Sequence, residues 1–239
     1  MKKLILSGLF TIYAFSLFAQ DNKVFVKDAH ARPRNITGSF SAISVSGAID
    51  LYLSQSDEEV VVVSAAEAKY RDRIVTEVMN GELKIYYNNK GLQWSTGSKK
   101  LKAYVSFKAI QGLTASGASD IYVNGVVKAD ALRINISGSS DFKGAVDVDH
   151  LSLEQSGSSR ISGRAQNVKI EVSGASDVKG YDLVAGYCEA SASGASDIQI
   201  TVTKELTASA SGASDIYYKG QGITRNIKSS GASSVVRRD

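Results

Sequence analysis

The stretch Ser193-Gly194-Ala195-Ser196-Asp197-Ile198 decides the fold, because the chain contains eight versions of it. Each version begins with Ser-Gly and continues with Ala or Ser, and the glycines are Gly47, Gly117, Gly138, Gly157, Gly174, Gly194, Gly212 and Gly231. From Gly117 onward, successive glycines lie 21, 19, 17, 20, 18 and 19 residues apart. Such a regular period indicates a repeat architecture, in which each repeat forms one unit and stacks on the next.

Apolar residues occupy alternate positions before the glycines, as at Leu132, Ile134 and Ile136. Asp stands three residues after the glycine in six of the eight repeats. An apolar residue follows that position in all eight, namely Leu51, Ile121, Phe142, Ile161, Val178, Ile198, Ile216 and Val235. A period of two is typical of a β-strand with one buried face, so each repeat is predicted to be strand, Ser-Gly turn, strand.

These patterns predict an all-β protein, a right-handed parallel β-helix with coils of about 19 residues. Successive coils would stack about 4.8 Å apart, so that equivalent residues form ladders. Glycine suits the turn because it adopts positive φ and lets another backbone approach closely. The handedness rule for parallel crossovers favours a right-handed coil. One proline and 21 glycines also favour strands joined by tight turns.

Gly117 follows Gly47 by 70 residues, and the segment between them departs from the repeat. Strands are expected at 60–64, 74–79, 82–88 and 101–107, with a hairpin at Asn80-Gly81 and a short helical turn within 65–73. We interpret 48–116 as an N-terminal insertion, built either as wider coils or as a small antiparallel cap. A cap would cover the unpaired backbone groups at the open end of the first coil.

The first 19 residues are predicted to be a signal peptide, with Lys2 and Lys3 before a short apolar run. Residues 20–37 would form a flexible leader, and 38–239 one β-helix domain with regular coils at 117–236. The net charge of +4 falls to +2 without the two lysines, which argues against nucleic-acid binding. No later apolar run is long enough to span a membrane. We therefore expect export to the periplasm or the cell surface.

An exported chain with Ser-Gly-Ala-Ser-Asp repeats followed by Ile or Val resembles the bacterial family described as "putative auto-transporter adhesin, head GIN domain". The resemblance covers residues 38–236 and implies a right-handed β-helix with an adhesin-like role. Because the repeats continue almost to residue 239, we do not expect self-secretion.

The Asp residues after the turns would form a column, with Asp177, Asp197 and Asp215 on adjacent coils. A divalent cation held by these three carboxylates is one interpretation. Turn-forming Asp residues that accept hydrogen bonds from backbone amides are the favoured one. Arg160 is expected at the same position between Asp141 and Asp177, where it would pair with both.

No catalytic residue and no cofactor are predicted. The first serine of the phrase is present in all eight repeats and is interpreted as a hydrogen-bonded turn ladder. His150 is interpreted as a surface residue, because no triad spacing places a base beside a nucleophile. Cys188 occupies the inward position of Leu132 and Leu206 in other coils, which indicates a core residue.

Aromatic residues are the better candidates for ligand binding. Tyr52, Tyr122 and Tyr217 fall two residues after the Asp position, where they should face outward, and Trp94 lies in a polar stretch. Contact with sugars or protein partners is one interpretation of these residues, and ordinary cross-strand packing is the favoured one. The sequence therefore predicts a non-catalytic binding protein for a glycan or a protein. A structural protein that self-assembles through its coil ends is the alternative, and a polysaccharide-degrading enzyme is disfavoured.

Overall fold

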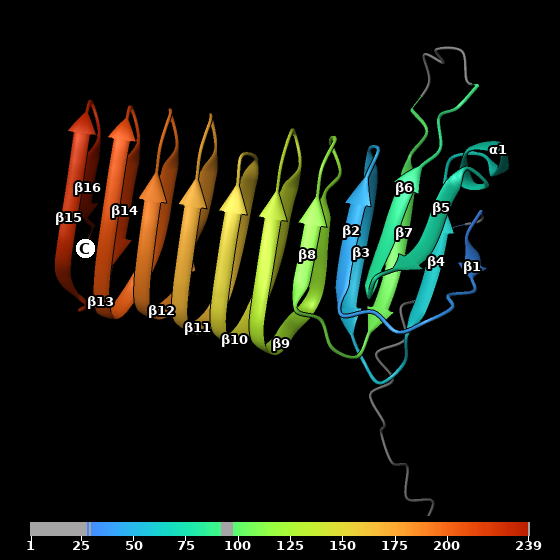
Figure 1. Ribbon diagram of the computed structural model, residues 1–239, viewed down its shortest axis with the longest axis horizontal. Coiled ribbons are helices and arrows are strands. Elements are labelled where there is room, and N and C mark those ends of the chain that lie inside the picture. Colours follow the sequence, from blue (N-terminus) through green and yellow to red (C-terminus); the bar gives the residue numbers. More distant parts are fainter. Residues whose placement is uncertain (1–27, 29, 92–97, 239) are drawn as a thin grey trace, which may run out of the picture.

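The computed structural model describes residues 28, 30–91 and 98–238 and shows a rod of stacked β-coils (Figure 1). Strands make up 68% of the chain and helix 2%, and the solenoid has about seven turns of some 19 residues. The predicted all-β, right-handed parallel β-helix is confirmed.

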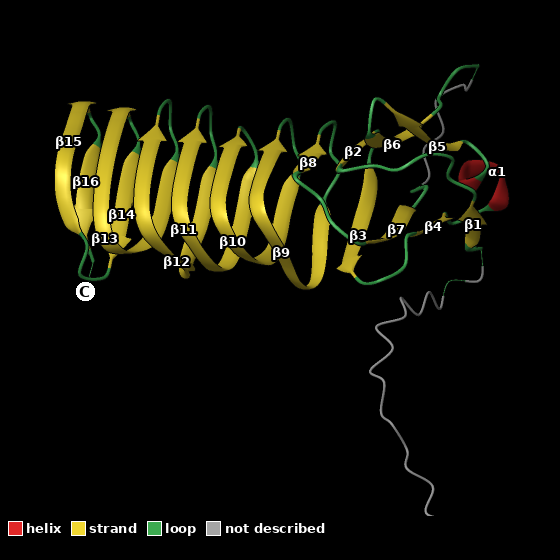
Figure 2. Cartoon of the chain, turned by 60° about the horizontal axis from the view of Figure 1, so that its bottom comes forward, coloured by secondary structure: helices red, strands yellow, loops and turns green. Residues whose placement is uncertain are grey.

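The regular coils are five long strands that each bend once around the rod (Figure 2). They are β9 (Ile121–Ile136), β10 (Asp141–Gln155), β11 (Ser158–Val172), β12 (Asp177–Ala192) and β13 (Asp197–Gly212). Each pairs with the next in parallel. After them, β14 (Asp215–Lys219) and β15 (Ile223–Gly231) pair with β13, and β16 (Ser234–Arg237) begins a further coil by pairing with β14. We call the segments that lead into the Ser-Gly turns the pre-turn sheet and those that leave them the post-turn sheet.

The core lies between these two sheets and consists of apolar ladders. One ladder joins one inward residue per coil, namely Leu132, Leu151, Val168, Cys188 and Leu206. Its members are at most 4% exposed. The alternation seen in the sequence is therefore the alternation between core and solvent.

Seven of the eight turn glycines have positive φ, and Gly157 is the exception. At Gly194 φ is +86°, and a Cβ atom would lie 2.6 Å from the carbonyl oxygen of Gly174 in the preceding coil. Both reasons for glycine, backbone conformation and close approach, therefore apply there. The second serine closes the turn, since Ser196 and Ser214 donate from Oγ to the carbonyl oxygen three residues earlier, at 3.0 and 2.9 Å. The sequence interpretation had assigned this role to the first serine.

One turn is shorter than the others. Gln155 is in register with Val172, and Ser158 with Asp177, so two residues (156–157) occupy the turn where the next coil has four (173–176). The Gln155 side chain fills the gap. Its amide nitrogen donates to the carbonyl oxygens of Gly157 and Asp177, at 3.1 and 2.9 Å, and its amide oxygen accepts from the Ser159 hydroxyl. We call the coil that begins at this turn the short coil.

This two-residue deletion corrects the predicted place of Arg160. Arg160 lies in register with Lys143 and Lys179, and Ser158 occupies the Asp position. The expectation that Arg160 pairs with Asp141 and Asp177 was therefore wrong. The predicted position of Ile161 is wrong for the same reason. The buried Ser159, not Ile161, lies in register with Phe142 at the apolar position after the turn.

The N-terminal region adds layers to the outside of the first coil. That coil is formed by β2 (Ala42–Ser46) and β3 (Ile49–Gln55), which pair in parallel with β8 (Gly112–Ala115) and β9. On the other side, β6 (Glu82–Tyr87) and β7 (Leu101–Phe107) form a further parallel layer. Then β5 (Ile74–Met79) and β4 (Val60–Ser64) pair antiparallel with β6 and β7. The predicted strands and the Asn80-Gly81 hairpin are confirmed, and β4 and β5 form an antiparallel layer outside the parallel layer of β6 and β7.

The two ends of the rod differ (Figure 1). At the N-terminal end, β1 (Arg32–Arg34) pairs antiparallel with β4, and α1 (Ala68–Arg71) lies beside them. Residues 32–34 fall in the predicted flexible leader, and this strand corrects that expectation for them. At the C-terminal end, every residue of β15 is exposed. Among the described residues, no strand pairs with the outer side of β15 or β16.

The predicted signal peptide and Trp94 lie outside the described residues. Within the described part of the chain, no helix has the length and apolar character needed to cross a membrane.

Candidate binding surface

The outer face of the post-turn sheet carries one continuous column of aromatic and basic side chains. Strand register places them on consecutive coils in the order Tyr104, Tyr52, Tyr122, Lys143, Arg160 and Lys179. We call these six residues the tyrosine–basic column. Gln199 and Tyr217 continue it toward the C-terminal end.

The three tyrosines form a stack. The ring centroids of Tyr52 and Tyr104 lie 5.1 Å apart at an interplanar angle of 18°, and those of Tyr52 and Tyr122 lie 5.1 Å apart at 16°. Both faces of the Tyr52 ring are therefore covered by its neighbours. Burial raises the pKa of all three phenols, so they remain protonated and can donate hydrogen bonds at neutral pH. The stack presents ring edges and hydroxyl groups to a ligand.

Basic residues continue the column from the last ring. The Lys143 ammonium lies 5.2 Å from the centroid of the Tyr122 ring, and it also lies 3.5 Å from a carboxylate oxygen of Asp141. Arg160 and Lys179 follow on the next two coils and are exposed. Aromatic groups and cations thus meet on one face of the rod.

The predicted aspartate column runs beside the tyrosine–basic column. Asp177, Asp197 and Asp215 occupy adjacent coils in register. Asp215 accepts hydrogen bonds from the Ser234 amide and hydroxyl, at 3.0 and 2.6 Å. These bonds, with one from Tyr217, lower its pKa. Burial, and then the neighbouring carboxylates of Asp177 and Asp215, raises the pKa of Asp197.

Backbone capping is therefore the observed role of at least part of this column. Asp120 likewise accepts from the backbone amide of Asp141, at 2.9 Å. Across residues 28, 30–91 and 98–238, no three His, Cys, Asp or Glu side chains gather as a group able to hold a metal ion.

The structure brings two of the four predicted ligand-binding residues together. Tyr52 and Tyr122 are in contact, and Tyr104 completes their stack. Tyr217 lies on the same column, separated from Tyr122 by four coils. It donates to Asp215 at 2.8 Å and lies 4.6 Å beneath the Arg238 guanidinium.

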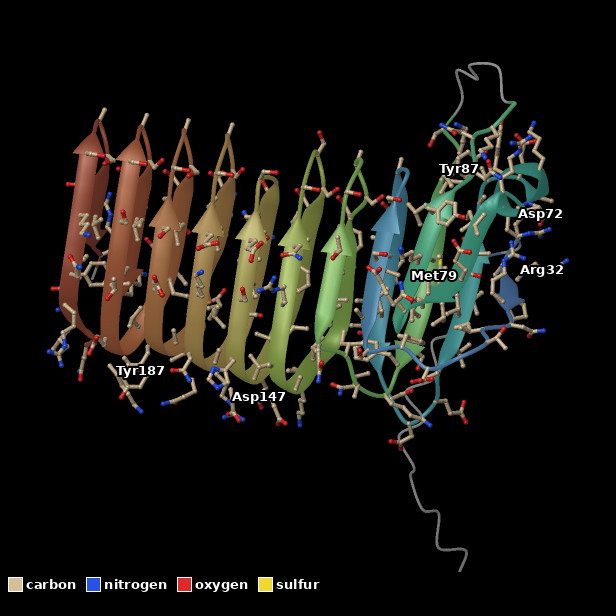
Figure 3. All side chains as sticks on the ribbon, in the orientation of Figure 1. Arg32, Asp72, Met79, Tyr87, Asp147 and Tyr187 are labelled. Carbon is tan, nitrogen blue, oxygen red and sulfur yellow. The ribbon has the colours of Figure 1, made fainter. Side chains whose placement is uncertain are left out.

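The sequence analysis missed a shallow hollow on the opposite, pre-turn face. It comprises two adjoining depressions of about 730 and 560 Å³ that extend over five coils. Charged residues in it pair with one another, as Arg133 does with Glu154 at 3.8 Å and Lys169 with Glu171 at 2.8 Å. Tyr187 lies at its edge, on the side of the rod away from the turns (Figure 3). The sequence signal for this hollow was the pair of small outward residues three positions before Gly194 and Gly212, namely Ser191 and Ser209.

Neither of the reactive residue types considered in the sequence lies in a catalytic arrangement. Cys188 is buried, and burial raises the pKa of its thiol to about 12, so it remains an inert core residue. His150 is exposed and lines the pre-turn hollow.

The comparisons with known structures establish the fold. A crystal structure of a "putative adhesin" from Bacteroides fragilis gives a TM-score of 0.80 at 19% identity, covering 87% of this chain and 96% of that one. A "putative lipid binding protein" from Parabacteroides distasonis gives 0.64 at 23% identity, covering 88% and 97%. A "putative adhesin" from Parabacteroides merdae gives 0.65 at 20% identity, with the same coverage.

No curated protein gives a significant match to the chain. The model of one protein family, in contrast, matches residues 39–222, which include the insertion and the regular coils. The chain belongs to this family, which is described as "Putative auto-transporter adhesin, head GIN domain".

Proposed function

We propose that this protein is an exported, non-catalytic binding protein that holds an extended glycan along the tyrosine–basic column. The observation that carries the proposal is the continuity of the column over six coils, a length of about 24 Å for five intervals of strand spacing. A linear polymer laid parallel to the rod axis would meet phenol groups on three consecutive coils and cationic groups on the next three. Membership of an adhesin-like family and the predicted signal peptide support a place at the periplasm or the cell surface.

The stack geometry determines how a glycan would be held. Because the faces of Tyr52 are covered by Tyr104 and Tyr122, sugar rings would lie against the ring edges. The protonated phenols of Tyr52 and Tyr104 would donate to sugar hydroxyls, whereas the Tyr122 hydroxyl donates to Asp120. Aromatic side chains fixed by packing lose little conformational entropy on binding. A protein segment with similar polar groups is the other ligand class that this surface would accept.

The engagement of one carboxylate beside the column, that of Asp120, supports a non-catalytic role. Glycoside hydrolysis uses two carboxyl groups on either side of the scissile bond, one of them free to donate a proton. Asp120 is instead engaged by the Tyr122 hydroxyl at 3.0 Å and by the Asp141 amide at 2.9 Å. Such a carboxylate serves the turn and the tyrosine.

The test is binding of the mature chain, residues 20–239, to a broad glycan panel, with calcium and with a chelator. Tyr52→Ala should lower the affinity for a bound glycan at least tenfold, because it removes the centre of the stack. Tyr187→Ala, on the pre-turn face, is the matched control and should leave the affinity within twofold. The reverse pattern would place the site in the pre-turn hollow, and equal affinity in calcium and chelator would show that glycan binding does not depend on a cation at the aspartate column.

Assembly of the rod through its C-terminal coil is a second candidate function. The specific observation is that Ile223 and Ile227 on β15 are 57% and 41% exposed at the open end of the solenoid. A second copy could pair tail to tail there, as unpaired strand edges do. Residues 216–238 contain Lys219, Arg225, Lys228, Arg237 and Arg238 and no acidic residue, so salt should strengthen such a dimer by screening repulsion. A monomer in light scattering at both low and high salt would exclude it.

A further inference from the structure

Three cationic residues occupy consecutive coils where the tyrosine–basic column crosses the short coil. Lys143, Arg160 and Lys179 are in register and exposed. Their spacing is that of hydrogen-bonded strands, about 4.8 Å, so their charges repel one another. Such a column of like charge is unfavourable unless a neighbouring or bound anion compensates it.

A carboxylate stands beside the first and the third of these cations, but not beside the middle one. The residues in the adjoining column are Asp141, Ser158 and Asp177, so the carboxylate is missing beside Arg160 only. Lys143 lies 3.5 Å from the Asp141 carboxylate. Arg160, in contrast, forms no ion pair within 4.0 Å with any residue of the described ranges. The missing carboxylate is a direct consequence of the shortened turn, which moves Ser158 into the Asp position.

The same turn leaves a recess beside these side chains. It has a volume of about 140 Å³, enough for a small oxyanion, and its polar lining comprises Asp141, Lys143, Ser158, Ser159, Arg160, Asp177 and Lys179. A guanidinium group matches a carboxylate or a sulfate through two parallel hydrogen bonds. The Ser158 hydroxyl lines the same recess as the Arg160 guanidinium and is a further hydrogen-bond donor.

We infer that the short coil forms an oxyanion-binding site that selects acidic glycans, those that carry carboxylate or sulfate groups. This inference rests on the proposed function for its polymer, since it assigns the charge of the ligand that lies on the tyrosine–basic column. Arg160 is the principal contact, with Lys143 and Lys179 on either side. A neutral glycan would gain nothing from this part of the column.

The most informative variant is Ser158→Asp. It restores the residue that the regular coils carry at this position, so the fold should tolerate it, and it supplies the carboxylate that Arg160 lacks. Ser158→Asn has nearly the same shape without the charge and is the matched control. Arg160→Gln removes the guanidinium while keeping a polar side chain.

The experiment measures binding of the mature chain to inorganic sulfate, oligogalacturonate, dextran sulfate and neutral dextran by calorimetry. We expect sulfate and one acidic polymer to bind, Ser158→Asp and Arg160→Gln to lose at least tenfold in affinity, and Ser158→Asn to stay within threefold. Oligogalacturonate and dextran sulfate distinguish a carboxylate from a sulfate ligand. Equal binding by wild type and Ser158→Asp would overturn the inference.

The design separates this inference from the proposed function. Binding of sulfate alone, with every polymer inert, would support the oxyanion site and contradict the glycan function. Binding of neutral dextran that depends on Tyr52 but not on Arg160 would support the function and overturn the oxyanion site. Binding to vesicles of anionic phospholipid is the last measurement. If the vesicles bind and both acidic polymers do not, the ligand is a membrane surface and the assignment of an acidic glycan is wrong.

Discussion

The short coil and its regular neighbours form the turn between the two sheets in different ways. In a regular coil, four residues round the corner, with a glycine at positive φ and a serine hydroxyl closing the loop, as at Gly194 and Ser196. In the short coil two residues suffice, and the Gln155 side chain makes the contacts that the missing residues would have made. The comparison teaches that the array tolerates a deletion at the corner when a buried polar side chain restores the hydrogen bonds.

The shorter turn also changes which side chains lie on the outer surface. Regular coils place an acidic residue beside the tyrosine–basic column, as at Asp177 and Asp197, whereas the short coil places Ser158 there. The coil with the shortened turn is thus also the coil that lacks the carboxylate, and it is the middle one of the three coils that carry consecutive cations.

The largest expected effect is at a regular turn. Gly194→Ala should lower the free energy of unfolding by about 3 kcal/mol, because it combines a left-handed backbone conformation with overlap against the Gly174 carbonyl. Gly125→Ala is the control, since Gly125 also has positive φ but open space around its Cβ position. It should cost about 1 kcal/mol. Chemical denaturation of both variants checks this, and equal losses would show that close approach between coils contributes nothing.

The next effect belongs to the short coil itself. Gln155→Leu should cost about 2 kcal/mol, because an apolar side chain suits the ladder shared with Val172 but leaves the Ser159 hydroxyl and two carbonyls without their partner. Val172→Leu, in the adjacent regular coil, is the control for a change in volume. If Gln155→Leu is neutral in thermal unfolding, the amide does not replace the missing turn residues.

A smaller effect is expected for the hydroxyl that closes a regular turn. Ser196→Ala should lower the free energy of unfolding by about 1 kcal/mol, the usual net value of one hydrogen bond. Ser191→Ala, an outward residue of the same coil, should change it by less than about 0.5 kcal/mol. A loss at Ser191 as large as that at Ser196 would contradict the assigned role of the second serine.

The smallest expected effect is the pH dependence of stability that arises from two stacked carboxylates of the regular coils, those of Asp197 and Asp215. The pKa of Asp197 is raised above its ordinary value of 3.8, so its charge destabilises the fold at neutral pH, and this cost disappears as the pH falls through the folded pKa. Asp197→Asn should therefore raise the melting temperature at pH 7 and leave it unchanged at pH 3.

Asp215 should behave in the opposite way. Its lowered pKa stabilises the fold above 3.8, and that stability is lost as the pH falls through the folded pKa. Asp215→Asn should lower the melting temperature at pH 7, and both changes should stay below about 1 kcal/mol because solvent screens exposed charges. Shifts of the same sign for the two variants would contradict the assigned environments.

Much of the fold could be predicted from the sequence, because stacking forces each coil to repeat the same small turn and the same inward residues. The eight Ser-Gly pairs located every corner, and Asn80-Gly81 located the hairpin of the insertion. The place of Arg160 could not be found by aligning glycines. The register of the short coil depends on the Gln155 side chain acting as part of the turn. The sequence marks this place only by a polar residue at the inward position of Ile136 and Val172, which does not show how many residues the turn has lost.

The candidate site was predicted in part for a similar reason. Outward positions on a strand follow from the period of two, so Tyr52 and Tyr122 were correctly expected to face outward on one column. Their stacking with Tyr104 depends on β7 entering beside β3, a pairing that reverses the chain order and is set by the tertiary fold. The pre-turn hollow likewise depends on the shape of the whole sheet.

The most direct test of the account is the dependence of affinity on ligand length. If an acidic glycan lies along the tyrosine–basic column, affinity for oligosaccharides of increasing length should rise until the ligand spans from Tyr104 to Lys179, about 24 Å, and then level off. Arg160→Gln should lower that plateau, whereas Tyr187→Ala should leave it unchanged. Affinity that is independent of length, or that falls only in the Tyr187 variant, would contradict the claim that this column holds an extended ligand.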